Sequence, residues 1–144
     1  MTDLTWTLDT NMLVYALSPD QFPAKQRIAK HLLAKLGQPE SCLIGQVVGE
    51  FMTVMLRKKA KSHAQALETV HLICQGVQVR GASTESYHQA FELVAKHHYQ
   101  MWDALIIAIC AEHGVKTLYS EDAGSLKRPL GVHVINPFAE LELS

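Results

Sequence analysis

The sequence predicts an α/β fold of three layers, α/β/α, in which helices cover both faces of a central parallel sheet of four to five short strands. Short apolar segments typical of buried strands alternate along the chain with longer segments whose apolar residues recur at helical spacing. The chain has 144 residues, of which 48% are hydrophobic and 19% are charged, and this is typical of one compact domain. We therefore expect a single domain over residues 1–144.

The first element is a strand that ends at an acidic residue. Residues 4–8 are rich in Leu, Thr and Trp and are typical of a buried strand. Asp9 follows directly, and residues 12–17 are apolar again, which favours a helical turn. A carboxylate between two apolar segments is costly unless something there needs it. Taken alone, Asp9 also fits a turn residue that caps the short helix.

The next elements continue the alternation. Residues 23–36 have the pattern of an amphipathic helix, and residues 42–44 that of a short buried strand. A second helix is expected over residues 46–58, where apolar side chains cover most of the circumference. The narrow polar stripe that remains on this helix consists of Gln46, Glu50, Thr53 and Arg57.

A third helix follows, and the remaining strands are short. Ser62 and Gln65 suit a capping box at the start of a helix that reaches residue 74. Three further strands are expected over residues 77–79, 115–119 and 132–135. Each is too short to stand alone, so we expect all of them to join the central sheet.

Two more helices are predicted between residues 84 and 114. Thr84 can cap a helix over residues 85–97, whose inward side chains are expected to be Tyr87, Phe91, Val94 and Ala95. Residues 101–111 are apolar all round except for Asp103, so we expect a central buried helix, closed by Gly114.

Four acidic residues are expected to meet at one edge of the sheet. Asp9 and Asp122 each follow the end of a strand, and functional groups of parallel sheets gather at the carboxyl ends of the strands. Helices run back antiparallel to the strands, so their N-termini lie at the same edge. Glu50 comes early in the helix after the second strand, and Asp103 opens the helix before the fourth.

These four carboxylates predict a site for a hard divalent cation. Each one alone fits an ordinary turn, a solvated position or a helix start. Two carboxylates about 6 Å apart, however, repel by roughly 3 kcal/mol at an effective dielectric constant of 20. A stable fold with four of them on one rim therefore needs a counter-ion, and oxygen ligands suit Mg²⁺ or Mn²⁺. Such a centre points to phosphoryl chemistry on a phosphodiester.

Four segments around these acids, in this order, resemble the PIN domain family. They are Asp-Thr-Asn at residues 9–11, Gln-Val-Val-Gly-Glu-Phe at 46–51, Trp-Asp-Ala-Leu-Ile at 102–106 and Leu-Tyr-Ser-Glu-Asp at 118–122. The resemblance extends over essentially the whole chain and is greatest to the VapC-type toxins of bacterial toxin–antitoxin pairs. It implies a PIN-like three-layer fold and an endoribonuclease that depends on Mg²⁺ or Mn²⁺.

The resemblance also implies roles for individual residues. The metal-binding catalytic acids would be Asp9, Glu50, Asp103 and Asp122. Asn11 matches the polar position two after the first acid, and Ser120 matches the hydroxyl two before the last, where it could orient the ion or its water. Gly45 departs from the family pattern, because relatives often carry Ser or Thr at this position.

The partners and compartment are expectations of the same kind. The family resemblance implies an RNA substrate, a small cognate antitoxin and a toxin homodimer. The net charge of −1 gives no global attraction to nucleic acid. Two basic groups could steer RNA phosphates, 57–61 and 127–128, although solvated helix ends explain the first equally well, and neither is placed in the site. Three cysteines without paired spacing and no visible signal peptide or membrane span lead us to expect a soluble, cytoplasmic protein.

Two alternatives stay open at this point. A phosphoaccepting receiver domain has a similar length, but it would need a pair of acids after the first strand and a Lys after the fifth. Asp9 stands alone and Asn136 follows the last strand. The second alternative is a catalytically silent PIN-like module that only binds a protein partner. The complete set of four acids argues against it, and an activity assay decides.

Overall fold

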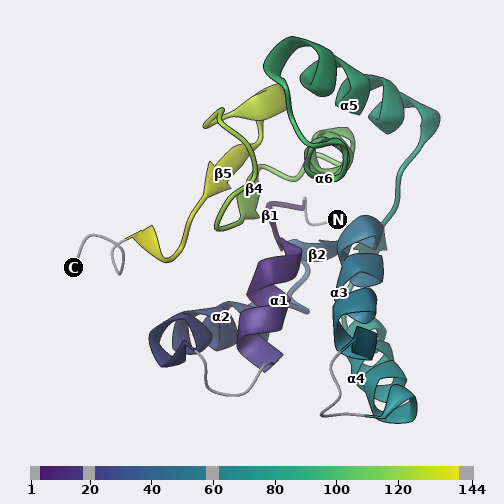
Figure 1. Cartoon of the computed structure of the whole chain (residues 1–144), viewed down its shortest axis with the longest axis vertical. Helices are drawn as coiled ribbons and strands as arrows, with labels where there is room; N and C mark the ends of the chain where they lie inside the picture. Colours follow the sequence, from purple (N-terminus) through teal and green to yellow (C-terminus); the bar gives the residue numbers. More distant parts are fainter. Residues whose placement is uncertain (1–3, 18–21, 58–61, 140–144) are drawn as a thin grey trace.

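A five-stranded parallel sheet forms the centre of the protein. The computed structural model describes residues 4–17, 22–57 and 62–139. The strands lie in the order β3-β2-β1-β4-β5, and every adjacent pair is parallel (Figure 1). They are β1 (Trp6–Leu8), β2 (Ser41–Ile44), β3 (Val79–Arg80), β4 (Thr117–Tyr119) and β5 (His133–Ile135). The first strand therefore lies in the middle, between β2 and β4.

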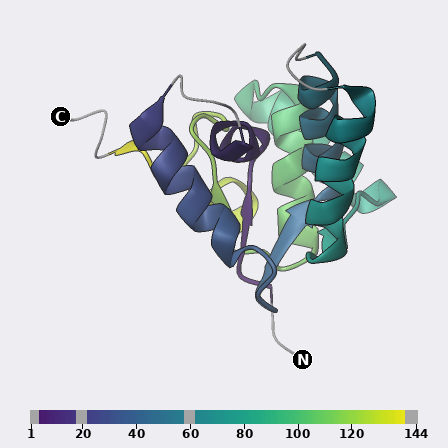
Figure 2. The same ribbon diagram turned by 90° about the horizontal axis from the view of Figure 1, so that it is seen from below.

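In the described part of the chain, six α-helices and a 3₁₀ turn surround the sheet. They are α1 (Thr10–Leu17), α2 (Pro23–Lys35), α3 (Gly45–Arg57), α4 (His63–Gln75), α5 (Thr84–His97), α6 (Met101–Glu112) and η1 (Pro129–Gly131). Figure 2 shows α2 on one side of the strands and α3 and α4 on the other, with α1 seen end-on between them. The predicted three-layer α/β/α fold is confirmed. No helix in the described ranges has the length and apolarity needed to cross a bilayer.

The strand order excludes the receiver alternative. Receiver-like doubly wound domains have the order 2-1-3-4-5, whereas this sheet has the order 3-2-1-4-5. In the observed order β1 and β4 are neighbours, with Leu8 paired to Tyr119. The residues that follow these two strands are therefore adjacent at the carboxyl edge of the sheet. The predicted meeting of Asp9 and Asp122 requires this arrangement.

The helix α6 is the buried core helix that the sequence predicts. Its residues from Ala104 to Cys110 are all buried, while Asp103 lies in its first turn. Gly114 follows the C-cap residue with φ +75°, a conformation that favours glycine. Because α6 has no polar face, its position is fixed by packing on all sides, and this fixes Asp103 at its start.

The inward face of α5 differs from the prediction. Tyr87 and Phe91 are 40% and 53% exposed, and the residues that are buried instead are Ser86, Ala90 and Leu93. The prediction was wrong because it assigned the largest apolar side chains to the core. Small side chains such as Ala90 let α5 pack closely on its neighbour α6.

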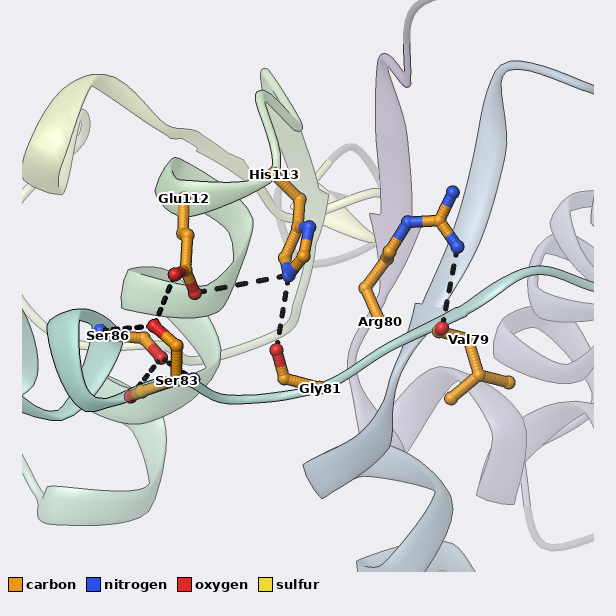
Figure 3. A network of polar contacts seen from close by, with 7 residues as sticks. All are labelled: Val79, Arg80, Gly81, Ser83, Ser86, Glu112 and His113. Carbon is orange, nitrogen blue, oxygen red and sulfur yellow. Dashed lines mark hydrogen bonds and ion pairs between the residues drawn. The ribbon is translucent and has the colours of Figure 1, made fainter.

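The start of α5 is tied to the end of α6. Ser83, and not Thr84, is the N-cap of α5, and it forms a capping box with Ser86. Figure 3 shows the Ser83 hydroxyl donating to a Glu112 carboxylate oxygen, while His113 Nε2 donates to Gly81 O over 3.1 Å. These contacts anchor the C-terminal end of α6, the helix that carries Asp103.

The other boundaries follow the prediction with small shifts. The capping box of Ser62 and Gln65 is present at the start of α4. The third strand is Val79–Arg80 instead of residues 77–79, because pairing with Leu43 and Ile44 sets its register. All three cysteines are free; Cys42 and Cys110 are buried, and Cys74 is half-buried.

Candidate active site

Asp9 is a buried carboxylate held by two hydrogen-bond donors. Its side chain is 6% exposed at the junction of β1 and α1. Oδ1 accepts from the backbone N–H of Thr10 over 2.7 Å, and Oδ2 accepts from Ser120 Oγ over 2.7 Å. Burial raises the pKa of Asp9, the two hydrogen bonds lower it, and the charges of Glu50 and Asp122 raise it again, so the net shift is upward.

Glu50 is fixed in place by neighbours on two helices. It lies in the second turn of α3 and is half-buried. Thr10 Oγ1 donates to Glu50 Oε2 over 2.7 Å, and Gln46 Nε2 donates to Oε1 over 2.8 Å. Thr10 thereby links Asp9 to Glu50, because its N–H donates to the Asp9 carboxylate and its hydroxyl donates to the Glu50 carboxylate.

Asp103 has a pKa that its burial and the other acids of the site raise. It lies in the first turn of α6, where Gln100 is the N-cap and accepts from the Asp103 N–H over 3.0 Å. Burial raises the pKa of its carboxyl group, and the charges of Asp9, Glu50 and Asp122 add to this, so that the pKa is about 6. Burial is the largest cause of this shift, and the nearby carboxylates increase it.

The four acids line one cavity, which we call the acidic cavity. Its volume is about 520 Å³, and its lining residues are Asp9, Thr10, Asn11, Glu50, Thr53, Val54, Arg57, Asp103 and Asp122. Asn11 and Asp122 are exposed there. Ser120 is buried and acts on the cavity through its hydrogen bond to Asp9. The structure thus brings the six residues named from the sequence to one place.

The cavity is also lined by residues that were not among the predicted site residues. Thr10, Thr53 and Arg57 belong to its wall. The polar stripe on α3 was the signal for the last two, since Glu50, Thr53 and Arg57 follow one another at helical spacing. Of the basic groups considered, Lys58, Lys59 and Lys61 lie outside the described residues, and the pair at 127–128 is not part of the cavity lining.

The donor set fits a hydrated magnesium or manganese ion better than a closed metal cage. Within residues 4–17, 22–57 and 62–139, no three acidic, histidine or cysteine side chains form a ready set of metal ligands. Mg²⁺ usually keeps several waters and binds through one or two carboxylates together with substrate phosphates. An open cavity lined by four carboxylates, one of which has a pKa of about 6, matches that mode of binding.

A second charged group lies beside Asp122. Glu121 forms an ion pair with Lys25 through Oε1 and accepts from the Tyr15 hydroxyl over 2.6 Å through Oε2. The Lys25 ammonium also lies 5.3–5.6 Å from the ring centroids of Tyr15, Phe22 and Phe138. We call these residues the Glu121 cluster. It ties the loop that carries Asp122 to α1 and α2.

Solved structures with the same fold contain bacterial toxins. VapC20 of Mycobacterium tuberculosis, described as a sarcin-ricin loop cleaving toxin, is 22% identical, with a TM-score of 0.66 over 82% of this chain and 90% of that chain. FitAcB of Neisseria gonorrhoeae is 19% identical, with a TM-score of 0.67 over 93% and 99%. VapBC2 of Rickettsia felis, bound to a promoter DNA fragment, is 17% identical, with a TM-score of 0.67 over 92% and 98%.

The family assignment comes from the sequence. A search of curated proteins finds no match to the chain. A model of the PIN domain matches residues 7–129, a range that begins in β1, ends in η1 and includes all four acids of the cavity. The chain therefore belongs to the PIN domain family.

Proposed function

We propose that the chain is an endoribonuclease that depends on Mg²⁺ or Mn²⁺ and acts as the toxin of a type II toxin–antitoxin pair. The observation that carries the proposal is the acidic cavity, in which Asp9, Glu50, Asp103 and Asp122 converge. Membership of the PIN domain family and the shared fold with VapC20, a toxin that cleaves the sarcin-ricin loop, support it. A cytoplasmic location, where RNA is available, is part of the proposal.

Each residue of the cavity has a part that follows from its contacts. Asp9 and Glu50 are held rigidly by Ser120, Thr10 and Gln46, so they can present fixed oxygens to a cation. The ionised form of Asp103, which burial and the neighbouring acids disfavour, would be stabilised by a bound cation. A bound divalent cation would offset these charges, polarise the phosphodiester and promote ionisation of the attacking water.

The catalytic proposal is tested with purified protein and structured RNAs. Cleavage is expected with Mn²⁺ or Mg²⁺ and is expected to be lost in EDTA and in the Asp9→Asn and Asp103→Asn variants. Glu85→Gln is the matched control, because Glu85 is an exposed acid on α5 that does not line the acidic cavity. Undiminished cleavage in EDTA or by Asp103→Asn contradicts the proposal. Inactivity of the wild type on all RNAs favours a silent binding module.

The proposed partners are a small antitoxin and a second copy of the chain. Support comes from neighbours of the same fold, one described as a toxin–antitoxin complex from Klebsiella pneumoniae and another as a DNA-bound VapBC from Salmonella typhimurium. The acidic cavity is complementary to an Arg side chain, which could neutralise it and displace metal. The apolar side of α3 offers no docking face, because Val47, Phe51 and Met55 are buried. The amphipathic helix α2 is a candidate docking face, since Ile28 and Leu32 line an apolar hollow with Pro137.

Expression in bacteria tests the biological half of the proposal. Induction of the wild-type chain is expected to arrest growth, and Asp9→Asn is expected to relieve the arrest. Co-expression of the neighbouring small open reading frame should also relieve it and yield a co-purifying complex. If the protein is harmless in cells but cleaves RNA in vitro, the toxin assignment is wrong and a housekeeping nuclease is the remaining interpretation. Light scattering on the purified protein measures whether it is a dimer.

A further inference from the structure

The wall of the acidic cavity carries a cation at a distance from its carboxylates. Arg57 lines the same cavity as Glu50, and both lie on the polar stripe of α3. Arg57 lies seven positions after Glu50, so it is on nearly the same face of the helix, about 10 Å further along its axis. Thr53 lies between the two, and its hydroxyl donates to Gly49 O over 3.0 Å. The cavity therefore has an acidic end and, along α3, a basic end.

Arg57 is not used to neutralise the acids of the cavity. Among the described residues, the ion pairs are Lys25–Glu121, Lys96–Glu92 and His113–Glu112, and none involves Arg57. Its side chain is exposed and has no hydrogen-bond partner in the described ranges. A guanidinium that faces a shared cavity without pairing to a carboxylate is free to bind an anion that enters it.

We propose that Arg57 binds a phosphate of the RNA strand that flanks the phosphodiester being cleaved, and so acts as a positioning residue. This inference rests on the proposed function, because it assigns a place to the same substrate. An RNA strand approaching four carboxylates is repelled wherever its phosphates are not compensated. The proposed divalent cation would offset this repulsion at the phosphodiester being cleaved, but the net charge of −1 gives no global attraction for the flanking phosphates, which a local cation can bind. Guanidinium binds phosphate through two parallel hydrogen bonds, which fixes orientation as well as adding affinity.

A purely structural role for Arg57 predicts different results. Arg57 lies in the last turn of α3, where a cation is favoured by the helix dipole. In that case its removal would lower the melting temperature and leave RNA binding unchanged. A phosphate contact instead changes RNA binding, its salt dependence and the KM for cleavage. It does so uniformly for unrelated sequences, because phosphates carry no base information.

The test compares Arg57→Gln with Arg57→Lys and with Arg27→Gln. Arg27 is the matched control, since it is an exposed arginine on α2 that lines a different hollow. Binding of two unrelated fluorescein-labelled single-stranded RNAs is measured over a range of KCl with Mg²⁺ in the non-cleaving Asp9→Asn background. KM and kcat for cleavage are measured with Asp9 intact.

Arg57→Gln is expected to weaken binding of both RNAs about tenfold at low salt. The slope of log affinity against log salt should become shallower by about 0.7, and KM should rise more than kcat falls. Arg57→Lys should keep the salt slope, and Arg27→Gln should match the parent. If the wild type cleaves RNA but Arg57→Gln matches Arg27→Gln, the inference is overturned while the proposed function stands. A loss confined to one RNA sequence overturns the phosphate assignment, and a wild type that neither binds nor cleaves RNA overturns both proposals.

Discussion

Ser120 donates a hydrogen bond from its hydroxyl to Asp9 Oδ2 over 2.7 Å, although 111 positions separate the two residues in the chain. The sheet order explains the contact. β1 and β4 are neighbours, and the Asp9 N–H donates to Tyr119 O over 2.9 Å, which sets Asp9 beside the end of β4. The hydroxyl favours the ionised form of this carboxyl group and so opposes the rise in pKa that burial causes.

Replacing Ser120 by Ala is therefore expected to weaken metal binding. Without the hydroxyl the pKa of Asp9 rises further, and its carboxylate loses the donor that orients it. Removal of such supporting contacts typically lowers metal affinity by about one to two orders of magnitude. The unfolding free energy should fall by about 1–3 kcal/mol, because a buried acceptor loses its partner. Titration calorimetry with Mn²⁺ and thermal denaturation measure the two effects.

Ser86→Ala separates the two effects. Ser86 is also fully buried and its hydroxyl donates to Ser83 O over 2.9 Å, but it lies at the start of α5, away from the acidic cavity. This variant should lose stability and keep its Mn²⁺ affinity. Equal Mn²⁺ affinity in Ser120→Ala and Ser86→Ala would show that Ser120 has only a structural role.

Asp103→Asn is expected to stabilise the metal-free protein at neutral and higher pH. The folded-state pKa of Asp103 is about 6, raised from 3.8, so between these values the folded protein holds the proton more tightly than the unfolded chain does. Its contribution to stability is complete below about pH 4 and is lost as the pH rises through about 6. Asn mimics the protonated form, so the variant should match the wild type near pH 4 and gain about 1 kcal/mol near pH 8, since solvent screens part of the repulsion.

Melting temperatures across this pH range, with and without Mn²⁺, test the prediction. The Mn²⁺-induced rise in melting temperature should shrink in Asp103→Asn, because a proposed metal ligand is lost. A clear loss of metal-free stability near pH 8 would instead mean that Asp103 serves mainly as a favourable charge at the start of α6.

The position of the acids could be predicted from the sequence because it follows from topology. Asp9 and Asp122 come directly after strands, and parallel strands end at one edge. The hydrogen bonds that hold those acids in place could not be predicted in the same way. The Thr10 hydroxyl reaches Glu50 across forty positions, which depends on the packing of α1 against α3. Arg57 was visible on the polar stripe, but only the shape of the cavity shows that this stripe forms its wall.

The orientation of α5 shows a limit of hydrophobic patterning. Phe91 and Tyr87 recur at helical spacing, and so do Ser86, Ala90 and Leu93, so the sequence offers two faces. Choosing the larger side chains failed, because the packing of α5 on α6 buries the face with the smaller ones. Patterning finds a helix reliably, but the partner helix decides which face is buried.

The Glu121 cluster is expected to stabilise the loop that carries Asp122. Burial tends to raise the pKa of Glu121, but the hydrogen bonds from Lys25 and Tyr15 and the charge of Lys25 lower it below 4.5 overall. A lowered pKa contributes stability above the unfolded value, and this is lost as the pH falls through the folded value. Glu121→Gln should therefore cost about 1 kcal/mol near neutral pH, and the difference should disappear in acid, once the pH has fallen through the lowered folded-state pKa.

A double-mutant cycle with Lys25→Met measures this pair, and Glu92→Gln is the control. The ion pair of Glu92 with Lys96 is well exposed on α5, so its removal should leave the melting temperature unchanged. Because Glu121 precedes Asp122, Glu121→Gln should also weaken Mn²⁺ binding. A stability effect that persists undiminished in acid would exclude the ionic explanation.

Gly124→Ala is expected to disturb the same loop from its other side. Gly124 has φ +88°, and a Cβ there would lie 2.2 Å from Cε2 of the Tyr99 ring. Tyr99 is buried, and its hydroxyl oxygen accepts a hydrogen bond from the Leu126 N–H over 3.0 Å. Moving the ring therefore breaks a hydrogen bond that holds the loop. The substitution combines backbone strain of about 1–2 kcal/mol with a steric cost of about 1–3 kcal/mol. Asp122 lies two residues before Gly124, so Mn²⁺ affinity should fall as well.

Gly114→Ala isolates the backbone part of that loss. Gly114 has a comparable φ of +75°, but a Cβ there would meet nothing within 4 Å. This variant should lose only the strain of about 1–2 kcal/mol and keep its Mn²⁺ affinity, because it lies at the end of α6 remote from Asp103. Chemical denaturation of both variants gives the difference directly. If the two variants lose equal stability and both bind Mn²⁺ as the wild type does, Tyr99 yields to the added methyl group without displacing Asp122. The contact between Gly124 and Tyr99 would then have no part in holding the metal-binding loop.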